Sequence, residues 1–141
     1  MYPGPGGYGG LFTAWDPVNG KAVWELKDHF PFWSGALATA GDVVFFGTMD
    51  GWFKAVDAHN GQELWKFKTG SGIIGQPVAY RGPDGKEYVA ILSGIGGWAG
   101  AIVSGGLDSR DPTAALGFVG AMKDLPSATT KGGTLYVFRL P

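Results

Sequence analysis

Cysteine is absent from the 141-residue sequence, and charged residues make up only 16% of it. The chain therefore has no disulfide, although exported proteins need not carry one, so the compartment stays open. The formal net charge of −1 provides no basic stripe, and a nucleic-acid partner is not expected. Apolar runs fall short of the roughly 18 residues that a membrane span requires. The opening MYPGPGGYGG lacks the basic and apolar regions of a secretion signal.

Glycine and aromatic residues, by contrast, are plentiful. The chain has 26 glycines, 14% aromatic residues and 45% hydrophobic residues. This mixture suits short strands joined by tight turns better than long amphipathic helices, and it is sufficient for a core. The composition therefore predicts an all-β chain of single-domain size and indicates no particular activity.

A repeat organises the sequence. Residues 14–24 read AWDPVNGKAVW and residues 55–65 read AVDAHNGQELW, a spacing of 41. A period of about 40 residues is typical of a four-stranded propeller blade. The shared positions are Ala14, Asp16, Gly20 and Trp24 in the first copy and Ala55, Asp57, Gly61 and Trp65 in the second.

Each copy is predicted to form a hairpin, because an Asn-Gly pair, a strong turn signal, divides two strand-like runs. Asp16 and Asp57 are expected to accept hydrogen bonds inside the two turns. The expected strands cover residues 11–16, 22–27, 52–57 and 63–68.

The remaining segments predict further strands and a short helix. Residues 42–48 and 87–94 are two β-branched and aromatic runs, which are typical of strands buried on both faces. Leu135 lies 82 positions after Phe53, twice the repeat, so the last segment is expected to form the first strand of a third copy. Residues 111–124 predict a short helix with Asp111 as its N-cap and Pro112 at the first position.

Two copies and one extra strand cannot close a propeller, which uses roughly four to eight blades. The chain is therefore expected to be part of a longer protein, with sheet edges and apolar faces left open. Such edges could also pair with a second copy in a homodimer. The expected division is a Gly/Pro-rich lead-in at 1–10, a first repeat at 11–51, a second repeat at 52–97, a loop or helical insert at 98–131 and a closing strand at 132–141.

The pattern Ala-x-Asp-x-x-x-Gly-x-x-x-Trp resembles the tryptophan-docking motif of the eight-bladed quinoprotein alcohol dehydrogenases. Further stretches resemble, in order, the C-terminal part of the methanol dehydrogenase large subunit, in particular its lanthanide-dependent type. They are MYPGPGG, FPFWSGALATAGDVVFFGTMDGWFKAVDAHNGQELWKFK, SGIGGWAG, DPTAALGFVGAMKDL and TKGGTLYVF. The combination of FWSG with a later GIGGWAG is more specific than the docking motif, which non-enzymatic propellers also carry.

The resemblance implies a partial β-propeller with about two four-stranded blades and a closing strand. It also implies that the chain takes part in binding pyrroloquinoline quinone (PQQ). Trp33 is implied to line the PQQ pocket, and Gly97 and Trp98 to touch the cofactor and close the substrate side. The family's catalytic base, metal ligands and adjacent-cysteine disulfide lie upstream, so no catalytic or metal-binding residue is assigned here. The parent enzyme would be periplasmic, oxidise primary alcohols to aldehydes with a lanthanide or calcium ion, and pass electrons to a c-type cytochrome.

The four tryptophans of these motifs also have a simpler, structural interpretation. Trp24 and Trp65 are interpreted as structural rings packed between adjacent blades. Without the resemblance, Trp33 and Trp98 would be interpreted as packing or rim aromatics. The alternative function is a non-enzymatic propeller that uses the same repeats as a protein-binding scaffold.

Other patterns point only weakly to chemistry. GIGGWA at 94–99 fits the dinucleotide pattern G-x-G-x-x-A, but no helix is expected to follow it, so no phosphate site is predicted. His29 and His59 are isolated in the sequence, and no carboxylate pair has the spacing of a metal site or of acid–base chemistry. A self-contained active site is therefore not predicted.

Overall fold

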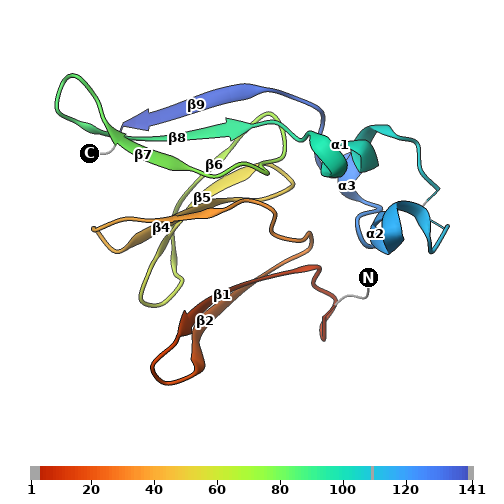
Figure 1. The fold of residues 1–141 in the computed structure, drawn as a ribbon, viewed down its shortest axis with the longest axis horizontal. Coiled ribbons are helices and arrows are strands. Elements are labelled where there is room, and N and C mark those ends of the chain that lie inside the picture. Colours follow the sequence, from red (N-terminus) through yellow and green to blue (C-terminus); the bar gives the residue numbers. More distant parts are fainter. Residues whose placement is uncertain (1–3, 109, 140–141) are drawn as a thin grey trace.

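The computed structural model describes residues 4–108 and 110–139, which form three antiparallel sheets and a group of short helices. Figure 1 shows the sheets side by side in chain order, with the helices gathered beyond one end of β8. This arrangement is the open stretch of propeller that the repeat predicts. None of the helices in the described ranges is long and apolar enough to cross a membrane.

The first sheet is a hairpin of β1 (Gly10–Asp16) and β2 (Lys21–Asp28). Alternate residues of β1 are half-buried, as expected of a strand with one covered face. Ala14 lies opposite Trp24, and the register shifts directly after Ala14. The hairpin predicted for the first repeat is therefore confirmed to within one residue at each strand end.

The second sheet has four strands and forms a complete blade. Ala55 lies opposite Trp65, and the register shifts directly after Ala55, so the second hairpin repeats the irregularity of the first. The two strands predicted for this hairpin coincide with the last two strands of the sheet, and the first two strands precede the hairpin in the chain. The order is β3 (Ala36–Ala38), β4 (Val43–Gly47), β5 (Trp52–Asp57) and β6 (Glu63–Lys68).

The two hairpin turns have the same construction. In each, the aspartate Oδ1 accepts hydrogen bonds from the amides two and three positions on, at 2.9 and 3.2 Å for Asp16 and at 2.7 and 3.2 Å for Asp57. Gly20 and Gly61 have φ angles of 64° and 73°, a left-handed conformation that favours glycine. Their amides donate to the carbonyl oxygens of Asp16 and Asp57, both at 2.9 Å. The aspartate and glycine of the repeat therefore define one turn that is used twice.

The third sheet has three strands in the described part of the chain. Its last strand lies beside the middle one, with Val137 opposite Ala90, just as β5 lies beside β4 with Ala55 opposite Phe45. The first strand of the third copy therefore takes the third place of this sheet, and among described residues no strand pairs with its outer edge. The order is β7 (Val78–Arg81), β8 (Glu87–Ser93) and β9 (Thr134–Arg139).

The helical insert expected near 111–124 is present, but in short pieces rather than as one helix. Gly117 at φ 84° and Ala115 at φ 47° interrupt it. Asp111 is not the N-cap, because the 3-10 turn begins only at Ala114 and has Thr113 as its N-cap. The Asp111 Oδ1 accepts hydrogen bonds from the amide and the hydroxyl of Thr113, at 2.8 and 2.7 Å. The pieces are a 3-10 turn (Ala114–Gly117), α2 (Phe118–Ala121) and α3 (Leu125–Ala128).

A further helix, α1 (Gly97–Ser104), corrects the expectation that no helix follows GIGGWA. Ala99 and Ile102 are 2% and 5% exposed, and their burial stabilises a helix whose glycines would not favour it in isolation. The dinucleotide pattern nevertheless lacks its usual setting, because β8 lies between antiparallel neighbours and not in a parallel βαβ unit.

The core consists of two clusters of buried hydrophobic residues. One packs the second sheet against the third and contains Phe45, Phe53, Ala55, Ile73, Val89 and Ile91. The other packs the helices against the ends of the sheets and contains Phe30, Met49, Ile95, Ala99, Ile102, Met122 and Leu125. The helical insert is therefore anchored to the propeller stretch by its own core.

Candidate functional site

Three aromatic rings from distant parts of the chain meet at the helical end of the molecule. The ring centroids of Trp33 and Trp98 are 5.7 Å apart, with planes tilted by 36°. Phe118 meets Trp98 edge-on at 4.7 Å and lies 6.1 Å from Trp33. Trp33 and Trp98 are 37% and 40% exposed, so both indoles present apolar surface to solvent. We call these three residues the aromatic cluster.

Trp33 lies in the loop between β2 and β3, and a neighbouring hydroxyl holds that loop. Ser34 Oγ donates to the carbonyl oxygen of Gly75 at 2.8 Å and accepts from the amide of Gly47 at 3.1 Å. Because the bonds reach both the end of β4 and the segment before β7, they tie the loop to two sheets. Ser34 belongs to the FWSG stretch, but the sequence interpretation assigned it no role.

Trp98 lies in the first turn of α1, at the point where the chain leaves β8. The amide of Gly94 donates to the carbonyl oxygen of Gly72 at 2.9 Å, and a Cβ on Gly94 would lie 2.5 Å from the carbonyl oxygen of Gly132. Only glycine therefore fits at Gly94. Gly97 has φ 56°, and nothing lies within 4 Å of the place of a Cβ on it. The backbone beside the aromatic cluster is therefore open to close approach.

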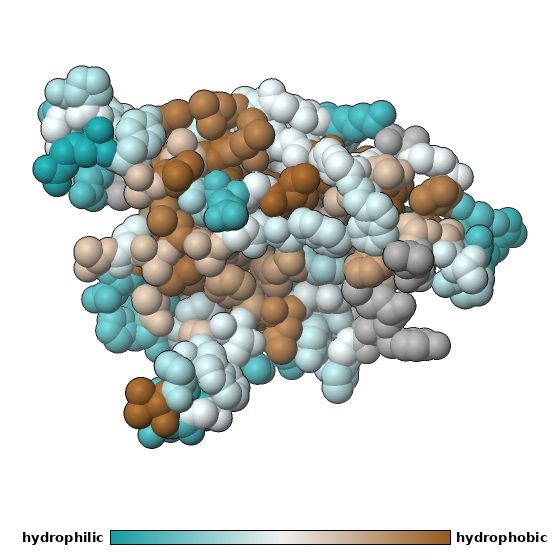
Figure 2. All heavy atoms as spheres, viewed as in Figure 1, coloured by the Kyte–Doolittle hydropathy of each residue, from teal (hydrophilic) through white to brown (hydrophobic). Residues whose placement is uncertain are grey.

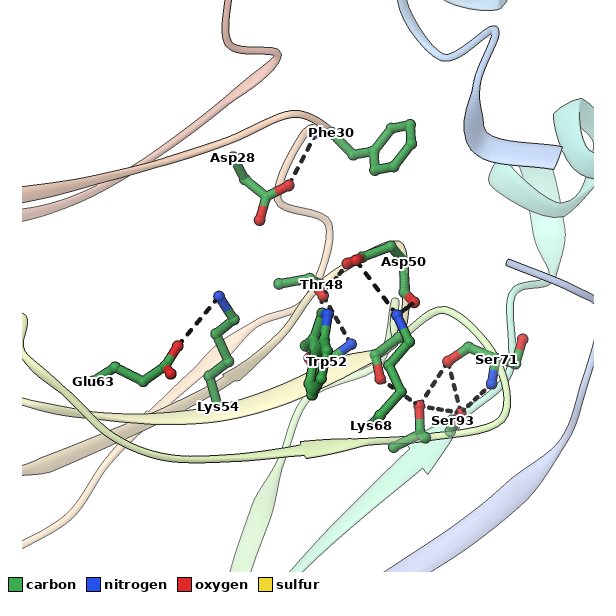
Figure 3. A network of polar contacts seen from close by, with 12 residues as sticks. Asp28, Phe30, Thr48, Asp50, Trp52, Lys54, Glu63, Lys68, Ser71 and Ser93 are labelled. Atoms are coloured by element: carbon green, nitrogen blue, oxygen red, sulfur yellow. Dashed lines mark hydrogen bonds and ion pairs between the residues drawn. The ribbon is translucent and has the colours of Figure 1, made fainter. Parts of the chain in front are cut away.

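A buried hydroxyl network supports the end of β8 (Figure 3). Ser93 Oγ donates to Thr69 Oγ1 at 2.9 Å and accepts from the amide of Ser71 at 3.2 Å. Ser71 Oγ accepts from the amide of Ile95 at 3.1 Å and donates to the carbonyl oxygen of Thr130. The network connects the segment after β6, the start of the α1 loop and the chain before β9. It fixes the backbone that leads to Trp98, because buried polar groups with partners are costly to displace.

Asp28 and His29 are titratable residues at the end of β2, the strand that precedes the loop of Trp33. Burial raises the pKa of Asp28, against a hydrogen bond from the Phe30 amide at 3.0 Å. His29 and Asp124 form an exposed pair, 3.1 Å between Nε2 and Oδ2, which joins the end of β2 to the residue before α3. Residues 4–108 and 110–139 contain no group of three histidine, aspartate or glutamate side chains that could hold a metal ion.

The two docking tryptophans lie at junctions between sheets. The Trp24 indole donates to the carbonyl oxygen of Ala58 at 2.8 Å, and a Cβ on Gly61 would lie 2.9 Å from the Trp24 ring. Trp24 of the first repeat therefore rests on the turn of the second. Trp65 packs its ring against Phe138 of β9, with centroids 5.1 Å apart and planes at 75°. Both rings join one sheet to the next.

Comparisons with known proteins show what the chain is similar to. The family model described as glucose/ethanol/alcohol dehydrogenase, β-propeller domain, with PQQ as its short name, matches residues 25–89. The lanthanide-dependent methanol dehydrogenase of Methylacidiphilum fumariolicum is 54% identical over 145 residues, which are 99% of this chain and 24% of that protein. Methanol dehydrogenase [cytochrome c] subunit 1 of Methylobacterium organophilum is 49% identical over 99% of this chain and 23% of that protein.

Among solved structures, a europium-containing methanol dehydrogenase matches with a TM-score of 0.85 and 56% identity, over 92% of this chain and 23% of that one. The chain thus spans about a quarter of the length of the relatives it matches. With its sheets and docking motif, the chain is similar to the β-propeller family of the PQQ-dependent alcohol dehydrogenases. Within that family it is similar to the lanthanide-dependent methanol dehydrogenases, which confirms the resemblance seen in FWSG and GIGGWAG.

Proposed function

We propose that this chain is part of a PQQ-dependent dehydrogenase that oxidises primary alcohols to aldehydes. In this proposal it supplies propeller scaffold and one wall of the quinone pocket. The observation that carries the proposal is the pair of half-exposed indoles, Trp33 and Trp98, 5.7 Å apart beside open glycine backbone. The docking repeats alone would suit a binding scaffold, but such a scaffold does not need two exposed tryptophans in contact.

The residues present fit the chemistry of PQQ. A flat, tricyclic quinone favours aromatic walls, and the two indoles provide them. Its carboxylates favour backbone N–H groups, and the first N–H groups of α1 have no acceptor within the helix. Among the residues that the structure describes, nothing lies within 4 Å of the place of a Cβ on Gly96 or Gly97, so a ligand can approach this backbone. No acidic side chain stands in the first turn of α1.

In this proposal Trp33 and Trp98 hold the cofactor in place and exclude water from one side, and Gly97 allows its close approach. The bound quinone supplies the acceptor for the electrons of the alcohol. The catalytic base and the ligands of a lanthanide or calcium ion, which provides Lewis acidity, come from the rest of the protein. The periplasm and a c-type cytochrome as electron acceptor belong to the same proposal; a relative's name, methanol dehydrogenase [cytochrome c] subunit 1, supports the cytochrome.

In this proposal the exposed apolar faces of the chain pack against the rest of the propeller. The outer face of the first sheet exposes Leu11, Trp15 and Val23, and hydrophobic surface gathers over the region of β8 and β9 in Figure 2. A groove of about 450 Å³ also lies between the second and third sheets beside Trp65. Exposed apolar faces of this kind are energetically unfavourable in water, and neighbouring blades of the propeller would cover them. The exposed residues of the third sheet are Val78, Tyr80, Leu92, Leu135 and Val137.

A chimera tests the proposal. This chain replaces the matching quarter of the Methylacidiphilum fumariolicum enzyme, and PQQ content and dye-linked alcohol oxidation are measured with a lanthanide present. The chimera is expected to retain PQQ through gel filtration and to oxidise methanol, whereas Trp98→Ala loses at least about tenfold in PQQ affinity. Trp65→Phe is the matched control and keeps the cofactor. Full PQQ retention in both Trp33→Ala and Trp98→Ala would overturn the proposal in favour of a scaffold.

A further inference from the structure

We propose that Phe118 is a positioning residue that fixes the orientation of the Trp98 ring, and that this is the role of the helical insert. The effect on PQQ rests on the proposed function above, whereas the effect on the indole pair does not. Phe118 is remote in sequence from both tryptophans, and no motif in the sequence singles it out. Its role follows from the geometry of the aromatic cluster.

Phe118 contacts the Trp98 ring directly. Phe118 meets the Trp98 ring at 4.7 Å with planes at 81°, the edge-to-face geometry that aromatic pairs prefer. The other aromatic neighbour of Trp98 in the described ranges is Trp33, tilted by 36° at 5.7 Å and itself 37% exposed. Trp98 is 40% exposed, so on its solvent-facing side no packing contact restricts the orientation of its ring. Phe118 is therefore the nearer and better anchored of its two aromatic neighbours.

Buried neighbours anchor Phe118. Its neighbour Val119 is 3% exposed, and the amide of Met122, a fully buried residue, donates to the Phe118 carbonyl oxygen at 3.0 Å. Gly117, with φ 84°, turns the chain immediately before Phe118. The half-buried Phe118 ring packs against the helical core cluster. The backbone of α2 is thus held by buried residues while the ring at its first position reaches the indoles.

The contact with Phe118 affects the orientation of the indole pair. The Trp98 ring contacts Phe118 at 4.7 Å and Trp33 at 5.7 Å, and the Phe118 and Trp33 rings are themselves 6.1 Å apart, so the three rings pack as one triangle. A leucine keeps apolar volume but has no ring edge, so the tilt between the two indoles is no longer set. A site that binds a flat cofactor depends on such pre-set orientation, because a mobile wall must be ordered on binding.

The test uses circular dichroism, because two indoles in contact produce an exciton couplet that depends on their mutual orientation. The couplet is measured on the 141-residue chain and, as a difference spectrum, on the chimera prepared without PQQ. Its loss in Trp33→Phe assigns it to the Trp33–Trp98 pair. Phe118→Leu is expected to reduce the couplet by more than about half, and Phe118→Tyr to restore it, since both aromatic rings offer an edge. Phe67→Leu is the control, because Phe67 contacts Trp65 and is 38% exposed.

The second measurement is PQQ retention in the chimera, where Phe118→Leu is expected to weaken affinity by up to about tenfold and Phe67→Leu to leave it unchanged. A couplet that persists in Phe118→Leu overturns the positioning role, whatever happens to stability. If the couplet falls but neither Phe118→Leu nor Trp98→Ala changes PQQ retention, the positioning role stands and the proposed quinone wall is wrong. The two failures are therefore distinguishable.

Discussion

The indole nitrogen of Trp24 donates a hydrogen bond to the carbonyl oxygen of Ala58, which lies 34 residues further along the chain, at 2.8 Å. The same ring covers Gly61, where a Cβ would approach it to 2.9 Å. The tryptophan of one repeat thus rests on the aspartate–glycine turn of the next. The repeat seen in the sequence is therefore the element that joins neighbouring sheets.

Replacement of Trp24 tests this junction. Trp24→Phe keeps most of the packing but leaves the half-buried Ala58 carbonyl without its donor, which is expected to cost about 1–3 kcal/mol of unfolding free energy. Trp24→Ala also removes the ring and is expected to cost about 3–5 kcal/mol. Urea denaturation measures both. Equal stability of Trp24→Phe and the parent chain would show that the hydrogen bond contributes nothing.

Gly20 and Gly61 occupy the same place in the two repeats but differ in their surroundings. Both have positive φ, so an alanine is strained at either position by about 1–2 kcal/mol. Only Gly61 also has a tryptophan ring within 2.9 Å of the Cβ, whereas nothing lies within 4 Å at Gly20. Gly61→Ala is therefore expected to destabilise the chain clearly more than Gly20→Ala in thermal unfolding. Identical losses would contradict the docking of Trp24 on this turn.

Asp28 predicts a pH dependence. Burial raises its pKa above the ordinary value of 3.8, with Asp50 adding to the effect and the Phe30 amide and Lys54 opposing it. The folded state then binds the proton more tightly than the unfolded state. The stability linked to Asp28 is therefore fully present below pH 3.8 and is lost as the pH rises through the raised folded pKa. Asp28 and its neighbours appear in Figure 3.

Asp28→Asn removes that titration and keeps an oxygen for the Phe30 amide. At neutral pH the variant is expected to unfold at a higher temperature than the parent, and the difference is expected to vanish in acid. Unfolding temperatures across pH 3 to 7 provide the comparison. A variant that is less stable than the parent at pH 7 would rule out the desolvation of Asp28 as a net cost.

Ser34 is expected to matter for both stability and cofactor retention. Ser34→Ala removes the bonds to the Gly75 carbonyl and from the Gly47 amide, a loss of about 1–3 kcal/mol. It also releases the loop that carries Trp33, so the chimera is expected to retain PQQ less well. Ser127→Ala is the control, since its exposed hydroxyl donates only to the Asp124 carbonyl at 2.7 Å. If Ser34→Ala and Ser127→Ala behave alike, the loop is held by other contacts.

The hairpins could be predicted from the sequence because the repeat carries its own turn chemistry. β5 and β6 have the predicted bounds, since an Asn-Gly turn and a fixed bulge determine the register locally. The short outer strands β3 and β7 could not be predicted, because three and four residues give no readable alternation. They form because the neighbouring strand offers unpaired backbone groups.

The helical part of the site was harder to predict, because it depends on tertiary packing. α1 begins with two glycines, Gly96 as cap and Gly97, and its stability comes from burying Ala99 and Ile102. Trp33 and Trp98 were singled out only through their resemblance to a family. Phe118 lies in DPTAALGFVGAMKDL, a stretch that resembles the family, but the sequence gives no sign of its contact with Trp98, because that contact joins distant segments.

The central claim is that Trp33 and Trp98 form one wall of a PQQ site. A crystal structure of the PQQ-loaded chimera tests it most directly. The quinone is expected in van der Waals contact with the Trp98 ring and the Gly97 backbone, with Trp33 on the same wall and Phe118 behind Trp98. A quinone bound away from both tryptophans, in a chimera that still oxidises methanol, would contradict it.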